Sequence, residues 1–366
     1  MRLAWVELRD FRNHAHTQID PVPDGLIVAV GPNGEGKTNL LEGVYFPFSL
    51  ASPRVSATMP LVRDGAGAAY ARAEVETLGG RVLVEVEIPS HGASRVKVNR
   101  SPVRRKRDVR RQVRAVFFGP DDLDMVRGDP SHRRRFLDES LSVLWPLKES
   151  LLTAYDRALR QRNRLLKEWE GRGEPAGLEA WDEELVAAGS ALVGVRHEIV
   201  ARLALPASEE FQSLAGYQLE CTYAPNVDSE PAEVESAFRE RLAARRSDEL
   251  IRRTSLVGPH RDELELAVRD LGARAFASHG EAWAAALCLR LGLATAVASE
   301  VNEPPVLLVD DPFSALDPRR RDLVGERLAK RGGQVVISVA DEADVPAAAH
   351  ATWDVRGGVV VPRKAA

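Results

Sequence analysis

The 366-residue sequence contains only two cysteines, Cys221 and Cys288. So few thiols exclude a disulfide framework or a metal cluster and are typical of a reducing cytoplasm. A long apolar run is also lacking, because the longest, from Trp283 to Ala298, is interrupted by Arg290 and is too short to span a bilayer. No secretory signal pattern is present. We therefore expect a cytoplasmic protein with no membrane partner.

The chain also lacks an excess of basic charge. Its 50 Lys and Arg residues face 54 Asp and Glu residues, which gives a net charge of −4. Any surface that binds nucleic acid must therefore be a local patch. Internal repeats and low-complexity tracts are missing as well, and the length predicts two domains or one large divided domain.

One stretch carries a complete phosphate-binding pattern, Gly-x-x-x-x-Gly-Lys-Thr, at residues 31–38. An apolar run at residues 26–30 predicts a buried strand before it, and a helical pattern follows. Glycines let backbone N–H groups turn toward phosphate oxygens. Lys37 would neutralise the β- and γ-phosphates, and the Thr38 hydroxyl would ligate Mg²⁺, so we expect ATP and Mg²⁺ as cofactors. The predicted nucleotide contacts are Gly31, Pro32, Asn33, Gly34, Glu35, Gly36, Lys37, Thr38 and Asn39.

A turn after the first predicted strand, residues 2–11, carries two further candidates. Arg12 and Asn13 would lie near a nucleotide held by the P-loop, and a solvated turn is the alternative. The segments 69–75 and 81–88, joined at Gly79-Gly80, predict a β-hairpin, and residues 94–99 predict another strand. An antiparallel layer is therefore expected beside the nucleotide strand.

Two basic runs lie in the first half of the chain. Residues 95–114 contain ten Lys or Arg and one acid, Asp108, and residues 133–135 are all arginine. Such runs fit contacts to the phosphate backbone of duplex DNA, and the alternative is a solvated charged face. The predicted DNA contacts are Arg104, Arg105, Lys106, Arg107, Arg110, Arg111, Arg133 and Arg134.

The middle of the chain is predicted to be helical. Apolar spacing indicates helices over residues 134–171, with a break at Pro146, and over residues 178–199, where three heptads form a seam. The two favour an antiparallel hairpin, and its second helix is expected to be an ordinary bundle helix rather than a protruding arm. Pro206 is expected to end it. A strand at 218–223 and a charged helix at 233–253 follow.

The apolar run 305–309 ends in two carboxylates, Asp310 and Asp311. A buried strand that brings a carboxylate to a P-loop supplies the Mg²⁺ side of such sites, so we assign Asp310 to Mg²⁺ and Asp311 to orienting the attacking water. About 270 residues separate Thr38 from Asp310. The nucleotide fold is therefore split by an insertion.

Residues 278–281, Ser-His-Gly-Glu, precede a helical pattern and resemble the signature of ABC-type ATPases. The alternative is a helix-capping box between Ser278 and Glu281. In that class, Ser278 and Gly280 would contact the γ-phosphate held by another subunit, so that ATP joins a two-fold dimer. Residues 314–317 match the D-loop, and 334–339 predict a further strand. The predicted catalytic residues are Lys37, Ser278 and Asp311.

These blocks together resemble the RecF family of bacterial recombination mediators, and they cover the chain almost end to end. They are Phe11-Arg12-Asn13, Thr38-Asn39-Leu40-Leu41-Glu42, Arg133-Arg134-Arg135-Phe136-Leu137-Asp138, Gly258-Pro259-His260-Arg261-Asp262-Glu263-Leu264, Ser278-His279-Gly280-Glu281 and Asp310-Asp311. The asparagine after the P-loop threonine is similar to that of chromosome-structural and break-repair ATPases.

The resemblance implies an α/β fold, an ABC-type P-loop ATPase head with a mixed sheet, an antiparallel β layer and an inserted α-helical lobe. We place the head at 1–118 and 255–366 and the lobe at 119–254, although the signature near residue 278 can belong to the lobe. The resemblance also implies an ATP-dependent homodimer on duplex, gapped or junction DNA. Slow, DNA-stimulated hydrolysis would act as its switch, and RecO and RecR would act with it to load RecA.

The sequence departs from the family pattern at several positions. His279 and Glu281 stand where the family often has glutamines, and Ala340 stands where transporters carry a switch histidine. Asp311 is one methylene shorter than the glutamate of transporters. Residues 52–66 match only loosely, so no functional residue is assigned there. His260 and Arg261 are expected to pack domains together, or otherwise to share in the dimer interface.

Two other functions share these motifs. A transporter's nucleotide-binding subunit would need a stacking aromatic before the P-loop and a switch histidine. A shortened chromosome-structural ATPase would need far longer heptad runs than the three repeats found here.

Overall fold

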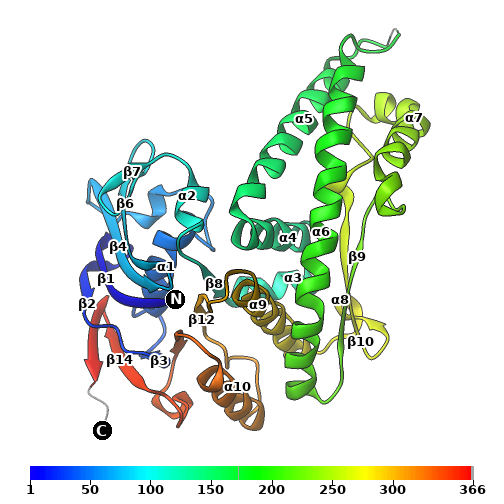
Figure 1. Ribbon diagram of the computed structural model, residues 1–366. Coiled ribbons are helices and arrows are strands. Elements are labelled where there is room, and N and C mark those ends of the chain that lie inside the picture. The colour runs from blue at the N-terminus through cyan, green and yellow to red at the C-terminus, as the bar shows by residue number, and fades with distance from the viewer. Residues whose placement is uncertain (172, 364–366) are drawn as a thin grey trace.

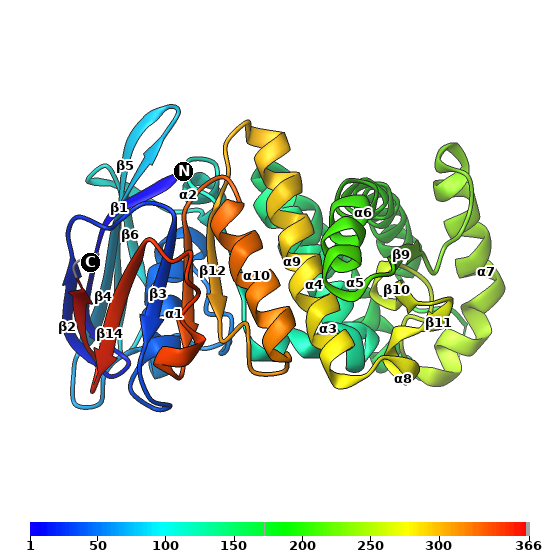
Figure 2. The same cartoon turned by 90° about the horizontal axis from the view of Figure 1, so that it is seen from below.

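The computed structural model describes residues 1–171 and 173–363, which form two lobes side by side (Figure 1). The sheet lobe comprises residues 1–118 and 306–363, and the helical lobe comprises residues 120–301 as far as they are described. The chain crosses into the helical lobe after strand β8 (Ala115–Phe118) and returns at β12 (Val306–Asp310). Figure 2 shows the sheets at one end, then α10 and α9, with α5, α6 and α7 at the other end.

A six-stranded, mostly parallel sheet forms the centre of the sheet lobe, with the order β15-β14-β3-β13-β12-β8. The P-loop strand β3 (Leu26–Val30) pairs in parallel with β13 and with β14. All five residues of β3 are buried, as in a strand covered on both faces. The other strands and the two helices connected to this sheet are β13 (Val335–Val339), β14 (Ala351–Arg356), β15 (Val359–Arg363), α1 (Lys37–Ser49) and α10 (Pro318–Lys330).

The predicted antiparallel layer is confirmed as a second six-stranded sheet with the order β2-β1-β4-β5-β6-β7. The predicted hairpin is the pair β4–β5, whose last partners are Thr77 and Gly80. Helix α1 and buried side chains of both sheets form one apolar cluster, which fixes the start of α1 against the parallel sheet. The strands of this layer are β1 (Arg2–Phe11), β2 (His14–Ile19), β4 (Ala68–Thr77), β5 (Gly80–Pro89), β6 (Arg95–Val98) and β7 (Ser101–Val103).

The helical lobe contains the predicted hairpin of α5 and α6. Phe238 of α7 packs on Gly189 of α6, where an added Cβ would lie 2.5 Å from the ring, so this hairpin is part of a bundle. Two short helices, η3 (Pro146–Lys148) at the predicted break and α2 (Lys106–Arg110) in the sheet lobe, complete the connections. The main elements are α3 (Asp124–Arg127), α4 (Pro130–Leu144), α5 (Glu149–Glu168), α6 (Leu178–Ala215), β9 (Leu219–Ala224), α7 (Val234–Arg252), β10 (Glu263–Val268), β11 (Leu271–Gly272), α8 (Ala273–Phe276) and α9 (His279–Val301).

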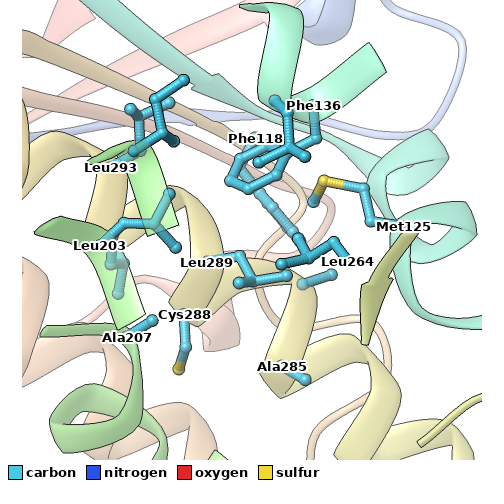
Figure 3. Packing of buried hydrophobic residues seen from close by; sticks show 14 of the residues in the cluster. Phe118, Met125, Phe136, Leu203, Ala207, Leu264, Ala285, Cys288, Leu289 and Leu293 are labelled. Atoms are coloured by element: carbon cyan, nitrogen blue, oxygen red, sulfur yellow. The ribbon is translucent and has the colours of Figure 1, made fainter. Parts of the chain in front are cut away.

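The prediction that Pro206 ends the second hairpin helix is wrong, because α6 continues through it to Ala215 over 38 residues. Such a helix is about 57 Å long. Tight packing on α9 maintains the helix beyond the proline: a Cβ on Gly292 would lie only 2.8 Å from the Leu203 carbonyl oxygen. Figure 3 shows Leu203 of α6 among the residues packed with α9. Burial here outweighs the hydrogen bond that proline cannot make.

Helix α9 is the central packing element of the molecule. Its 23 residues are long and apolar enough to cross a membrane, but most of them are buried inside the protein. Figure 3 shows its Cys288, Leu289 and Leu293 in the same core as Phe118 and Phe136. Because this cluster also includes one face of β3, β12 and β13, a continuous apolar core joins the two lobes.

The structure places residues 255–301 with the helical lobe, against the predicted boundary at 254. Strand β10 pairs along its length with β9, and α9 packs on α6. The predicted head segment therefore begins again only at β12, and the signature-like turn before α9 belongs to the helical lobe.

Candidate nucleotide-binding site

The P-loop connects β3 to α1 at the carboxyl edge of the parallel sheet, where open α/β sheets bind their ligands. Gly31 lies so close to β14 that a Cβ would come within 2.2 Å of the Val355 carbonyl oxygen. Gly36 has a φ of 111°, in the left-handed region that favours glycine. Pro32, Asn33 and Gly34 form the exposed crest of the loop. The geometry leaves backbone N–H groups of the turn available to an anion.

Lys37 folds back over the loop that contains it. Its Nζ donates hydrogen bonds to the carbonyl oxygens of Gly31, at 2.6 Å, and Pro32, at 2.9 Å. Burial lowers the pKa of this ammonium, and the charges of Asp310 and Asp311 oppose that shift. The single cation of the loop therefore lies in the field of both carboxylates that end β12.

Thr38 and Asp310 meet across the sheet edge, although 272 positions separate them in the sequence. The Thr38 hydroxyl donates to Asp310 Oδ2 at 2.8 Å, and the Ser338 hydroxyl of β13 donates to Asp310 Oδ1 at 2.6 Å. Burial raises the pKa of Asp310 despite these two hydrogen bonds. A hydroxyl and a carboxylate are the oxygen ligands that Mg²⁺ prefers, so this pair fits the predicted metal.

Asp311 follows in a left-handed backbone conformation, with a φ of 51°. Its N–H donates to the Ser338 hydroxyl at 3.0 Å, so one serine holds both carboxylate residues in place. Burial raises the pKa of Asp311, and the neighbouring Asp310 adds to this rise. Asp311 lies directly after β12, where the sequence predicts a carboxylate that orients the attacking water.

The turn residues Arg12 and Asn13 have different partners. The Asn13 amide donates to the Glu35 carbonyl oxygen at 3.2 Å and accepts from the Asn39 amide at 2.8 Å, so it braces the P-loop. Arg12 instead forms a bidentate ion pair with Glu42 of α1, at 2.9 and 3.0 Å. The Arg12 guanidinium is therefore paired with a residue of its own chain and does not point to a ligand as a free cation.

Two residues of the site have no counterpart among the sequence predictions. Arg54 lies in the loosely matched segment 52–66, donates to Asn39 Oδ1 at 2.9 Å and acts electrostatically on Asp310. No local pattern marks it, because only the fold brings this loop to the P-loop. Ser338, by contrast, is the one hydroxyl in the apolar strand 335–339, and a polar residue in a fully buried strand was a usable signal.

The signature-like turn is capped as the alternative interpretation expects. Ser278 is the exposed N-cap of α9: its hydroxyl accepts from the Glu281 N–H at 3.3 Å, and the Glu281 carboxylate accepts from the Ser278 N–H at 2.7 Å. A Cβ on Gly280 would lie 3.2 Å from the Ala315 carbonyl oxygen, so the turn lies beside the predicted D-loop of its own chain. Within residues 1–171 and 173–363, no hydrogen bond or ion pair connects the turn to the P-loop.

The predicted DNA contacts divide into two groups. Arg104, Arg105, Lys106 and Arg111 are exposed, and no ion pair to them is formed by the described part of the chain; Arg107 is half-buried. Arg110 is committed to Glu149, at 2.7 Å, and to the Ser49 carbonyl oxygen, at 2.6 Å.

The expectation that Arg133 contacts DNA does not fit the structure. Its side chain is buried and forms a bidentate pair with Glu263, at 2.6 and 2.8 Å. Arg134 is partly buried and donates to the Asp262 carbonyl oxygen at 2.9 Å. Both arginines hold α4 to the start of β10, so their charge is used inside the protein.

A cleft of about 1190 Å³ lies between the two lobes. Thr38, Arg54 and Asp310 line it on the side of the P-loop, and Arg134 and His260 line it on the side of the helical lobe. The candidate nucleotide site therefore opens into the space between the lobes, and a ligand in this cleft would lie between residues of both lobes.

The segment Gly258 to Leu264 has a packing role. The buried carboxylate of Asp262 accepts from Arg196 at 2.8 Å and from the Tyr223 hydroxyl. Burial lowers the pKa of His260 to about 4, and its Nδ1 is 2.7 Å from the Tyr155 hydroxyl. These contacts support the expectation that His260 packs elements together, whereas Arg261 is exposed.

Comparison with known proteins finds relatives along nearly the whole chain. The domain family described as the RecF/RecN/SMC N terminal domain matches residues 2–356. The chain is 41% identical to the DNA replication and repair protein RecF of Kineococcus radiotolerans, with 95% of each chain covered. It is 40% identical to the protein of the same name from Streptomyces avermitilis, with 94% of this chain and 95% of the relative covered.

Solved structures agree with these sequence relatives. The structure described as the recombination mediator RecF with ATP, in the RecFOR pathway, superposes with a TM-score of 0.90 at 26% identity, covering 99% of this chain and 98% of the other. An Smc head domain from Pyrococcus furiosus superposes with a TM-score of 0.59 at 17% identity and shares the fold alone. The predicted fold class, an ABC-type ATPase head with a helical insertion, is confirmed.

Proposed function

This chain belongs to the RecF family, within the wider group that carries the RecF/RecN/SMC N-terminal domain, and from this membership we propose that it is an ATP-dependent DNA-binding protein of replication and recombinational repair. ATP would bind at the P-loop and bring two copies together on DNA. Slow hydrolysis would then release them.

The observation that carries the proposal is the contact of Thr38 with Asp310, which brings the two halves of a nucleotide site together at one sheet edge. Lys37 lies in the field of Asp310 and is the basic side chain of the loop that would bind phosphate oxygens. A related RecF structure contains ATP, which supports ATP as the ligand. When bound, Mg²⁺ would be held by Thr38 and Asp310 and would neutralise phosphate charge.

A second copy would complete the site. Ser278 and Gly280 are accessible at the end of the helical lobe, yet they make no contact with the P-loop of their own chain among the described residues. Head-to-head pairing would let the signature turn of each copy close on the triphosphate of the other. To move a two-state equilibrium from 1:99 to 99:1, ATP must favour the closed dimer by about 5.5 kcal/mol.

Duplex DNA, including gapped or junction DNA, is the proposed partner of the exposed basic residues around α2. Arg104, Arg105, Lys106 and Arg111 are exposed and form no ion pair with any residue that the structure describes. Such residues bind phosphates with little regard for base sequence. RecR, with RecO and RecA in the same pathway, is the proposed protein partner. Family membership supports this, and the related structures are described as part of the RecFOR pathway.

The test measures mass by light scattering, with and without ATP, Mg²⁺ and duplex DNA. The wild type is expected to shift from the mass of a monomer, near 40.1 kDa, to that of a dimer with ATP. Lys37→Met should lose this shift because phosphate binding is lost, and Ser278→Arg should bind nucleotide but remain monomeric. A wild type that stays monomeric at saturating ATP and DNA would refute the proposal.

The variant Asp311→Asn tests hydrolysis separately from dimerisation. This variant should still dimerise but persist as a dimer, because it can no longer orient the attacking water. Unchanged ATP turnover in this variant would remove Asp311 from the proposed chemistry.

A further inference from the structure

Helix α1 contains a carboxylate that the P-loop pattern does not account for. Glu42 lies one helical turn after Thr38, and its side chain is completely buried. A buried carboxylate is costly unless donors surround it. Glu42 Oε1 accepts from Arg12 Nη2 at 3.0 Å and from the Ser52 hydroxyl, while Oε2 accepts from Arg12 Nε at 2.9 Å and lies 3.5 Å from Arg54 Nη1.

These donors hold one loop, residues 51–63, at both of its ends. Ser52 and Arg54 attach its beginning directly to Glu42. Arg12 attaches the end of the loop. Its Nη1 donates to the Pro60 carbonyl oxygen at 2.9 Å, and its backbone N–H donates to the Leu61 carbonyl oxygen at 2.8 Å. Apart from η1 (Met59–Leu61), the loop has no helix. The ion pair therefore supports its beginning, while the buried Leu61 and the bridge between Val62 and Phe11 help to hold its end.

The supported loop carries Arg54 to the open side of the P-loop. Its guanidinium contacts Asn39, the residue after Thr38, and its charge acts on Asp310. Arg54 also lines the interlobe cleft together with Thr38 and Asp310, and its side chain is 40% exposed. A cation in this place faces the region where phosphate and metal charge would gather.

We propose that Glu42 is a positioning residue for ATP turnover, which holds the loop 51–63 so that Arg54 stays beside the Mg²⁺ side of the P-loop. Glu42 itself is shielded from any ligand by Arg12 and Ser52. This proposal rests on the proposed ATPase function and adds a residue to its machinery. It also explains why Arg12, next to the P-loop, is committed to an internal ion pair.

The test compares Glu42→Gln, Arg54→Ala and the double variant with a matched control, Glu249→Gln. Glu249 is an equally buried carboxylate that pairs with Arg162 in the helical lobe, far from the P-loop in sequence. Turnover at saturating ATP, affinity for a fluorescent ATP analogue and thermal stability are measured for each. Glu42→Gln and Arg54→Ala should each lower turnover about 10- to 100-fold with affinity changed less than about threefold.

The double variant decides whether the two residues act as one unit. Its turnover should equal that of the lower single variant, because removing Glu42 already displaces Arg54. Glu249→Gln should lose thermal stability while its turnover stays within about twofold of the wild type. If Glu42→Gln does not fold, Ser52→Ala is used instead, and it should lower turnover without a change of ATP affinity.

Three outcomes would overturn the role of Glu42: wild-type turnover in Glu42→Gln, wild-type turnover in both Arg54→Ala and Ser52→Ala, or losses that multiply in the double variant. A wild-type protein that neither binds nor hydrolyses ATP is a different result. It would overturn the proposed function itself, and the role of Glu42 with it.

Discussion

Two arginine-rich runs look alike in the sequence but differ in the structure: one is largely exposed, and the other is largely paired inside the protein. In residues 104–111, four basic side chains are exposed and form no ion pair within the described chain. In residues 133–135, Arg133 is buried against Glu263, Arg134 donates to the carbonyl oxygen of Asp262 just before β10, and only Arg135 is exposed. A basic run is available to DNA only where the fold supplies no carboxylate for it.

The difference arises from tertiary pairing rather than from local charge density. Strand β10 brings Glu263 and the Asp262 carbonyl to α4, although about 130 residues separate them in the sequence. Beside helix α2, Glu149 is paired with Arg110, and the described residues form no ion pair with Arg104, Arg105, Lys106 or Arg111. The following predictions use stability and DNA affinity as two separate readouts of this contrast.

The largest expected effect is on the buried run. Arg133→Ala leaves Glu263 without its partner and should lower the free energy of unfolding by about 3 kcal/mol. Urea unfolding followed by circular dichroism measures this. DNA affinity of the folded fraction should stay the same, and a loss of DNA affinity at unchanged stability would reverse our assignment of the two runs.

The second effect concerns the exposed run. The triple variant Arg104→Ala, Arg105→Ala, Arg111→Ala removes three charges and should weaken binding to duplex DNA roughly 100-fold at low salt. The slope of log affinity against log salt should become shallower by about 2.7. Fluorescence anisotropy over a salt series checks both values, and unfolding by urea should be unchanged. Equal salt slopes for the variant and the wild type would show that DNA binds elsewhere.

A third test compares paired and unpaired charge at an acidic residue, Glu281, which is hydrogen-bonded within the fold. Burial alone would raise the pKa of Glu281, but hydrogen bonds from the Tyr217 hydroxyl and Ser278 lower it to about 2. Since an unfolded glutamate has a pKa of about 4.3, the ionised form stabilises the fold above that pH. This contribution, about 3 kcal/mol at roughly 1.36 kcal/mol per pKa unit, is lost as the pH falls from 4.3 toward 2.

Glu281→Gln provides the comparison for that pH dependence. Its free energy of unfolding should vary less between pH 5 and pH 3 than that of the wild type. The same slope in both proteins would mean that Glu281 is not held ionised by its partners.

The smallest effect is expected from the exposed member of the buried run. Arg135 is 61% exposed and pairs with Glu139 one turn away on the same helix. Arg135→Ala should change the free energy of unfolding by no more than about 0.5 kcal/mol. A loss as large as that of Arg133→Ala would mean that position in the run, rather than burial, determines the effect.

The elements that carry the candidate nucleotide site can be located from the sequence because each has a short local pattern. The P-loop, β12 with its two carboxylates and the capped turn at Ser278 each lie within a few consecutive residues. The arrangement of the P-loop beside the end of β12 follows from the rule that parallel strands end at the same sheet edge.

The remaining features depend on contacts between distant segments. Pro206 predicts a helix end, but packing of α6 against α9 carries the helix past it. Arg54 sits in a loop without any pattern, and its place is set by Glu42 and Asn39. The assignment of residues 255–301 to the helical lobe rests on the pairing of β10 with β9, which composition does not reveal.

The position of β3 between β13 and β14 has a consequence for synthesis of the protein. Both neighbours of the P-loop strand are encoded some 300 residues after it. At translation rates of 5–20 residues per second, the nascent strand waits roughly 15 to 60 s with neither edge hydrogen-bonded. Through that interval the emerging chain cannot retain nucleotide, and its bare edges are open to chaperones or to neighbouring nascent chains.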